Sequence, residues 1–195
     1  MTNPEYDLRY VGAAGEILKD YLLSKDIYRP IGIIADLGEP PYPQLTLGNM
    51  LLALQRAQAK TTTTQQRSNL HDLKDRVDII HQDWRVAWEN KAREEFRARL
   101  RLWGNYLDDF RKDPELHASR YSYEVGRRVL LEILHVEAHQ VPSEQEALLD
   151  GMDKLVHAFF IHDRFIWEPE LISQFPEITY WYLYGYLPSK LLSTF

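Results

Sequence analysis

The chain contains no cysteine and no long hydrophobic run, and both absences limit what it can be. Without cysteine among its 195 residues it has no disulfides, thiolate nucleophiles or iron–sulfur ligands, and it lacks the usual ligands of structural zinc. No stretch approaches the roughly 18 consecutive apolar residues of a membrane helix. The N-terminal sequence MTNPEYDLRY has neither the basic start nor the apolar stretch of a signal peptide. We therefore expect a cytoplasmic protein with no membrane contact.

An excess of positive charge is also missing. Lysine and arginine number 23 against 29 acidic residues, which gives a formal net charge of -6. This balance argues against general nucleic-acid binding and leaves nucleic acid as a partner only through a local arginine face. The sequence also has no phosphate-binding glycine loop, nucleophile elbow or dinucleotide fingerprint. We expect a single domain over residues 1–195, with no cofactor unless a divalent metal is bound.

Apolar residues at three- and four-residue spacing predict an all-α, multi-helix bundle of about six helices. The longest such pattern covers about residues 67–112 and contains no proline and one glycine, Gly104. We expect one very long helix here, on the order of 65 Å at about 1.5 Å per residue. Trp84, Trp88 and Phe96 lie on its apolar stripe, so we expect other helices or a second chain to bury them.

Local start and stop signals predict the remaining helices. Asn3-Pro4 opens a first helix, and Thr46 caps a second one, which a loop of threonines at 61–64 separates from the long helix. Asp113-Pro114 ends the long helix, and an antiparallel return helix follows over about residues 121–140. Ser143 and Glu146 form a capping-box pattern that starts another helix.

Two segments fit more than one structure. Residues 31–37 are short, β-branched and bounded by Pro30 and Gly38, so they predict either a strand or a buried extended segment. Residues 179–187 alternate tyrosine with other residues, as a strand would, but they also satisfy helical spacing after Pro176. The helical character of the rest of the chain favours a helix there.

The best candidate for a metal site is the polar stripe of the return helix. His135 and His139 stand four residues apart with Glu132 beside them, a spacing that lets two imidazoles bind one divalent ion. His81 follows Asp78 at the same acid-to-histidine spacing on the long helix, and it is a further ligand candidate. The simpler interpretation is that this stripe is the solvent face of an amphipathic helix.

A second alternative is a helical, metal-independent ribonuclease. Such an enzyme needs a histidine as acid or base and an arginine for the phosphate. Three arginine–histidine pairs have a suitable spacing, but in a chain with seven histidines such pairs also arise by chance: Arg76/His81, Arg111/His117 and Arg128/His135.

The remaining signals favour binding to another protein or to a second copy of the chain. Tyrosine and tryptophan are typical of surfaces that are apolar on one side and wet on the other. An arginine face on the long helix is a further candidate contact, although salt bridges within the helix explain it equally well. We therefore expect a non-catalytic adaptor or accessory subunit whose partner-binding residues are Tyr180, Trp181, Tyr182, Tyr184, Tyr186, Arg93, Arg97 and Arg101.

Overall fold

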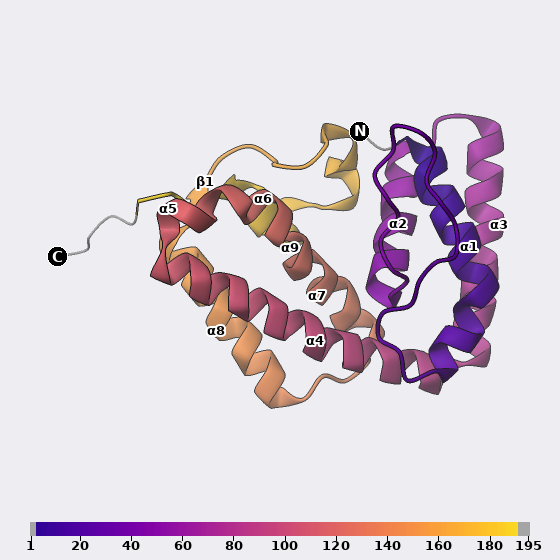
Figure 1. Cartoon of the computed structure of the whole chain (residues 1–195), viewed down its shortest axis with the longest axis horizontal. Helices are drawn as coiled ribbons and strands as arrows, with labels where there is room; N and C mark the ends of the chain where they lie inside the picture. The colour runs from indigo at the N-terminus through magenta and orange to yellow at the C-terminus, as the bar shows by residue number, and fades with distance from the viewer. Residues whose placement is uncertain (1–2, 191–195) are drawn as a thin grey trace. The chain divides into compact units, whose positions relative to one another are not determined.

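The computed structural model describes residues 3–190 and is mostly helical, as the sequence predicts. The chain divides into two compact units (Figure 1). Unit 1 comprises residues 1–95 and 133–139, and unit 2 comprises residues 96–132 and 140–195. Within residues 3–190, no helix combines the length and apolar character needed to cross a bilayer.

Three mutually packed helices make up most of unit 1: α1 (Pro4–Leu23), α2 (Leu47–Lys60) and α3 (Thr64–Asp83). Their starts follow the sequence signals. The Asn3 side chain accepts the N–H of Tyr6, Thr46 accepts that of Asn49, and Thr63 forms a full capping box with Gln66. Unit 1 also includes the first part of α4 (Arg85–Lys112) and the end of α7 (Gly126–Glu137).

Buried polar groups connect α4 to the rest of unit 1. The Lys91 ammonium donates to the carbonyls of Ser24 and Asp26 at 2.8 and 2.9 Å. Burial is the main reason why the pKa of Lys91 is lowered. Glu95 is fully buried and accepts the N–H of Gly48 at 2.9 Å, which places a carboxylate at the N-terminus of α2.

The predicted single helix over about 67–112 is not confirmed, because the structure has two helices of 20 and 28 residues in its place. The break lies at Trp84, whose φ of -120° and ψ of 30° leave the helical region. No proline or glycine marks it, and the hydrogen bonds continue on both sides, from Trp84 N–H to Ile80 and from Trp88 N–H to Trp84. Trp88 and Phe96 are buried as expected, whereas Trp84 is half-buried.

Unit 2 combines the second half of α4 and most of α7 with a long helix, α8 (Ser143–Phe159), and many short elements. Helical turns join α4 to α7, and β1 pairs antiparallel with β2 so that Ile161 lies opposite Tyr186. The short elements are α5 (Pro114–His117), η1 (Ala118–Arg120), α6 (Tyr121–Glu124), β1 (Ile161–His162), η2 (Pro169–Gln174), α9 (Glu177–Tyr180), η3 (Trp181–Leu183) and β2 (Gly185–Tyr186).

The structure refines several predictions. Residues 31–37 contain no strand, and the nearest pairing is an isolated bridge between Arg29 and Leu45. The return helix is interrupted at Val125, between α6 and α7. Helix α8 starts at Ser143 as predicted, but the capping box is absent because the N-cap residue is Pro142. Residues 179–187 contain both expected structures, first helical turns and then β2.

Candidate functional site

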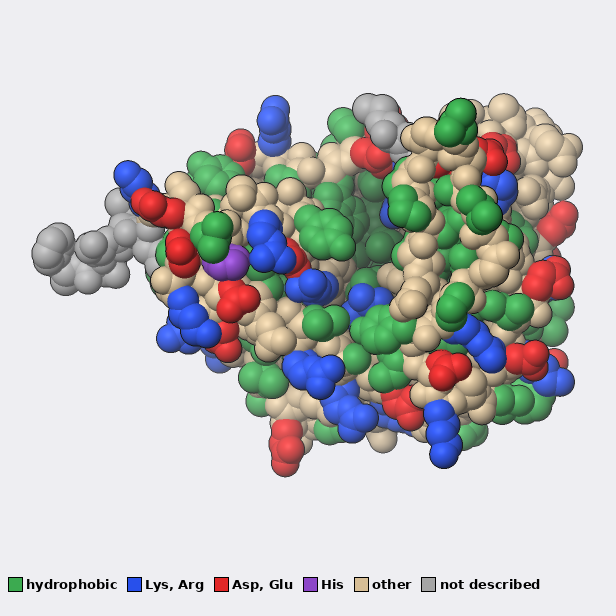
Figure 2. All heavy atoms as spheres, in the orientation of Figure 1, with side chains coloured by type: hydrophobic (Ala, Val, Ile, Leu, Met, Phe, Trp, Pro, Cys, Tyr) green, Lys and Arg blue, Asp and Glu red, His purple; other side chains and the backbone are tan. Residues whose placement is uncertain are grey.

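Two features of unit 1 stand out as candidate sites, an exposed apolar segment and a small cavity. The apolar segment consists of residues 31–38. Ile34 is 94% exposed, Leu37 107% and Ile33 37%, while Ile31 at one end is buried. Figure 2 shows hydrophobic side chains on the face of unit 1 where the connection from α1 to α2 runs in Figure 1. Three apolar side chains within five residues are therefore presented to solvent.

The ends of this segment are fixed. Arg29 and Leu45 exchange backbone hydrogen bonds of 3.0 and 2.7 Å. Arg9 of α1 pairs with Asp36 at 3.2 Å and with Glu39 at 2.5 Å. Hydrogen bonds to Tyr42 and Glu39 raise the pKa of Arg9. The exposed tip is thus held by charged contacts that stay outside the core.

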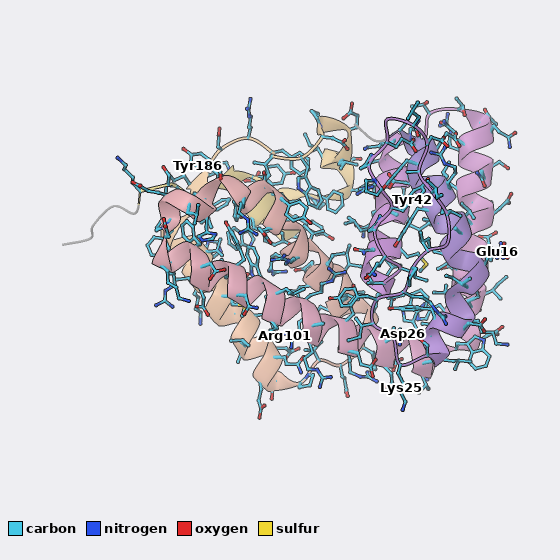
Figure 3. All side chains as sticks on the ribbon, viewed as in Figure 1. Glu16, Lys25, Asp26, Tyr42, Arg101 and Tyr186 are labelled. Carbon is cyan, nitrogen blue, oxygen red and sulfur yellow. The ribbon has the colours of Figure 1, made fainter. Side chains whose placement is uncertain are left out.

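Tyr42 secures the stretch that leads from the apolar segment into α2 (Figure 3). Its ring stacks on Tyr6 at 4.5 Å and on Tyr10 at 5.9 Å, and its hydroxyl accepts from Arg9 at 3.0 Å. Tyr10 in turn donates to the carbonyl of Gln44 at 3.1 Å. The connection is therefore an anchored segment with a displayed apolar tip.

The second feature, named here the His81 cavity, has a volume of about 190 Å³. The rings of His81 and Trp88 stack at 4.4 Å, and Trp88 Nε1–H donates to Glu137 at 2.7 Å. At another edge of the cavity, Lys74 Nζ donates to Gln58 at 3.1 Å. Helices α2, α3, α4 and α7 supply the lining, which consists of Leu51, Leu54, Gln55, Gln58, Lys74, Val77, Asp78, His81, Trp88, Ile133 and Glu137.

The histidines and acids proposed as metal ligands are not gathered at one point. Glu132 pairs with Arg128 at 2.9 Å, and His135 and His139 are both exposed. His139 has a positive φ of 57° just beyond the end of α7. Across residues 3–190, no group of three or more histidine, aspartate or glutamate side chains is placed to hold a metal ion. Metal binding by these residues stays a prediction.

In unit 2, Arg128 forms a buried network on the inner side of α7. It donates to Asp153 at 2.9 Å through both Nε and Nη2, and its guanidinium lies 4.6 Å from the ring centre of Tyr182. Burial is the largest single effect and lowers the pKa of Arg128, but the hydrogen bonds to Asp153 together with the electrostatic effects of Asp153, Glu132 and Tyr182 outweigh it, so the net shift is upward. This network is a structural element that joins α7, α8 and the C-terminal segment.

Each arginine of the three ribonuclease-like pairs is opposed by a carboxylate. Arg76 pairs with Glu16 at 2.6 Å, and Arg111 lies 3.9 Å from Asp108. Arg128 is engaged by Asp153 as described. A phosphate would have to displace these carboxylates, so the ribonuclease hypothesis also stays a prediction without support from the geometry.

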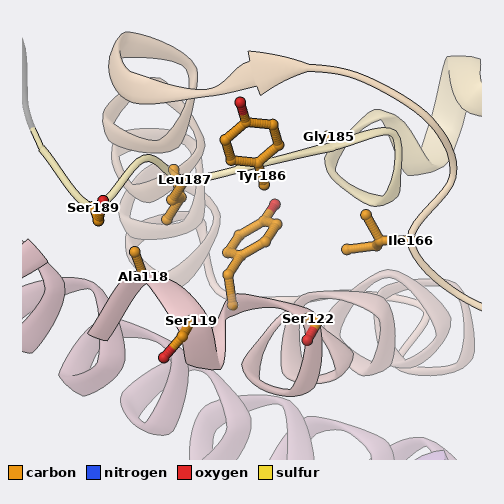
Figure 4. Close-up of a pocket in the computed structure, with 9 residues that line it drawn as sticks. Ala118, Ser119, Ser122, Ile166, Gly185, Tyr186, Leu187 and Ser189 are labelled. Carbon is orange, nitrogen blue, oxygen red and sulfur yellow. The ribbon is translucent and has the colours of Figure 1, made fainter. Parts of the chain in front are cut away.

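The predicted aromatic contact surface is used largely within unit 2. Tyr180 and Tyr182 are buried, and Trp181 stacks on His157 at 3.6 Å. Tyr184 packs against Phe165 and donates to the carbonyl of Phe175 at 2.9 Å. Tyr186 is 44% exposed and lines an open pocket of about 410 Å³ beside Leu187, with Ser119 and Ser122 opposite (Figure 4).

The arginines predicted as contacts differ from one another. Arg93 donates to the Ala138 carbonyl at 2.8 Å, just beyond the end of α7. Arg97 and Arg101 are exposed on α4, and Figure 3 labels Arg101. Arg93 therefore caps the C-terminal end of α7, while Arg97 and Arg101 are exposed to solvent.

No family model, no curated protein and no solved structure matches the chain. Function is therefore inferred from the geometry of this molecule alone. The apolar segment had only a weak sequence signal, because a short β-branched run between Pro30 and Gly38 is equally typical of a buried strand. For the His81 cavity, the sequence indicated His81 and Asp78 through their spacing on α3, but it gave no sign that groups from α2, α4 and α7 would meet them.

Proposed function

We propose that this chain is a non-catalytic interaction protein, an adaptor or accessory subunit, and that the apolar segment is its docking element. The observation that carries the proposal is the near-complete exposure of Ile34 and Leu37 on a segment held at both ends. Clustered exposed apolar groups are typical of sites that bury themselves against a partner. The proposal includes a cytoplasmic location, with which a chain free of cysteine is compatible.

The energetics favour docking by this segment. Complete burial of an Ile or Leu side chain contributes about 1.5–3 kcal/mol, and here nearly all of that area is still available. Anchoring of the segment reduces the conformational entropy that is lost on binding. The contacts of Arg9 with Asp36 and Glu39 provide this anchoring.

The partner in this proposal is another protein or a second copy of the chain. Tyr186, Arg97 and Arg101 are proposed as additional contact residues in unit 2, since their side chains are exposed. A local nucleic-acid contact through the two arginines is not favoured over a protein contact, because the chain as a whole is acidic.

Site-specific photo-crosslinking tests the proposal. A benzophenone amino acid is placed at Ile34, and a matched control carries it at Ile178, which is 92% exposed on α9 in unit 2. After irradiation in cells, we expect a discrete adduct from position 34 and none of the same mass from position 178. The double variant Ile34→Asp with Leu37→Asp should abolish the adduct captured from a third reporter at Ile33, with an unchanged melting temperature.

The variants are expected to fold, because substitutions at such exposed positions usually change stability by less than about 0.5 kcal/mol. Equal adducts from positions 34 and 178, or no adduct from position 34, would contradict the proposal. Sedimentation of the purified chain distinguishes the two partner classes, since a second copy gives a dimer that the double aspartate variant does not form.

A further inference from the structure

We propose that the His81 cavity binds a small organic ammonium ion that carries an apolar group, a role independent of docking by the apolar segment. The cavity volume of about 190 Å³ equals the share of about six waters in the liquid, at roughly 30 Å³ each. Sites for drug-sized ligands are larger, at about 300–1,000 Å³. The volume therefore suits a ligand of one ring or a short branched chain.

The apolar part of the ligand has a surface to contact. Leu54, Val77 and Ile133 line the cavity and are each less than a tenth exposed, so the protein has already removed them from bulk water. The stacked rings of His81 and Trp88 form an aromatic portion of the lining. Aromatic rings favour cations as well as apolar groups.

An unpartnered acceptor indicates that the ligand is a hydrogen-bond donor. Gln55 Oε1 is buried and finds no hydrogen-bond partner among the residues that the structure describes. A buried acceptor without a partner costs about 1–3 kcal/mol, and a ligand N–H would remove that cost. Gln55 is one of the residues that line the cavity, and the proposal pairs its amide oxygen with an N–H of the ligand.

The charges around the cavity favour a cation. Two carboxylates, Asp78 and Glu137, line it against one ammonium group, that of Lys74. Lys74 is engaged by Gln58, and Trp88 Nε1–H holds one oxygen of Glu137 in place. An anion would face both carboxylates, and residues 3–190 offer no three-ligand cluster for a metal ion. An organic cation with N–H donors satisfies the charge, the free acceptor and the apolar lining together.

Calorimetry on the full chain tests the ligand class with three probes of matched size. Benzylammonium carries the charge and the donors, benzyl alcohol is neutral, and benzoate is an anion. We expect saturable binding of benzylammonium with one site and a Kd below about 1 mM, at least tenfold weaker binding of benzyl alcohol, and none of benzoate. Absence of saturable benzylammonium binding, or equal binding of either other probe, would overturn the proposal.

Two variants locate the binding at the cavity. Glu137→Gln removes the charge but keeps an acceptor for Trp88 Nε1–H, and Gln55→Leu removes the unpartnered acceptor. Each should weaken benzylammonium binding at least tenfold, whereas the matched charge change Glu94→Gln, at an exposed position of α4, should not. Equal weakening by Glu137→Gln and Glu94→Gln would show a general charge effect and refute the site, and unchanged binding by Gln55→Leu would refute the assigned acceptor. The cavity lining and the apolar segment share no residue, so the docking proposal stands or falls separately.

Discussion

At the residue scale, Tyr121 and Tyr182 of unit 2 allow a buried hydroxyl group with a hydrogen bond to be compared with a buried hydroxyl group without one. Both are buried, but the Tyr121 hydroxyl donates to the Tyr182 carbonyl at 2.7 Å, while the Tyr182 hydroxyl finds no hydrogen-bond partner within residues 3–190. We expect Tyr121→Phe to cost about 0.5–1.5 kcal/mol and Tyr182→Phe to be neutral or slightly stabilising. Urea unfolding of the two variants measures this difference, and an equal loss in both would contradict it.

The same two tyrosines predict how stability responds to alkali. Burial raises the pKa of each phenol well above 10. A tyrosine whose pKa is raised in the folded state contributes fully to stability below about pH 10, the pKa of a phenol in the unfolded chain. This contribution is lost as pH rises through the pKa of the folded state. As pH rises above about 10, the free energy of unfolding of the Tyr182→Phe variant should therefore fall less than that of the parent. Absorbance of phenolate at 295 nm during the titration reports which state carries the proton.

Residue-level roles were predictable from sequence only where one helix supplied the whole pattern. The spacing of Arg128, Glu132 and His135 correctly placed them on α7, but the main partner of Arg128 is Asp153, 25 residues away on α8. His81 was a candidate from its spacing to Asp78, whereas Gln55 and Glu137 carried no signal, because their meeting depends on tertiary packing. Sequence periodicity shows which face a residue occupies and not which helix lies opposite.

At the scale of elements, the β1–β2 pair depends on the absence of a side chain at Gly185. A Cβ built there would lie 2.2 Å from the Ile161 carbonyl oxygen and 2.6 Å from the Phe160 ring. Gly185→Ala must therefore push the strands apart, at a cost of about 1–3 kcal/mol. Gly151→Ala in α8 is the matched control, since nothing lies within 4 Å of its Cβ and alanine favours a helix by about 0.5–1 kcal/mol.

Thermal unfolding of the two alanine variants should show opposite shifts, downward for Gly185→Ala and upward for Gly151→Ala. A Gly185→Ala variant as stable as the parent would mean that the β1–β2 pairing adds nothing to stability.

Helix starts were the most predictable elements, because a cap depends on residues a few positions apart. Thr46 caps α2 as predicted, and the threonine run separates α2 from α3 as predicted, although Thr63 also caps α3 and Thr64 already belongs to it. The break at Trp84 was not predictable, because no glycine or proline is present and Lys19, whose Nζ lies 4.9 Å from the Trp84 ring, comes from α1. On α3 only Leu70 and Val77 are buried, and the continuous buried stripe of α4 begins at Trp88. The apolar stripes of α3 and α4 are therefore separate in the structure, although their spacing in the sequence is that of one continuous stripe.

At the scale of the whole molecule, the chain passes between unit 1 and unit 2 three times, at residues 95–96, 132–133 and 139–140. The first passage lies within α4 and the second within α7. Backbone hydrogen bonds of an α-helix join residues four positions apart. If the part of α4 or α7 in one unit unfolds, the part in the other unit therefore loses the hydrogen bonds that cross the junction. A single domain over residues 1–195 stays a prediction, and the two helices that belong to both units are the feature on which it can be tested.

We therefore predict that the molecule unfolds in one cooperative transition. Leu18→Ala in unit 1 and Leu131→Ala in unit 2 each truncate a fully buried side chain, at a typical cost of about 2–5 kcal/mol. Each variant should move the whole calorimetric transition to lower temperature, with the calorimetric enthalpy still equal to the van't Hoff enthalpy. Glu94→Gln serves as the surface control and should leave the transition in place. Two endotherms, of which Leu18→Ala moves one and Leu131→Ala the other, would show instead that the units fold independently, because coupling through α4 and α7 would then be weaker than the difference in their stabilities.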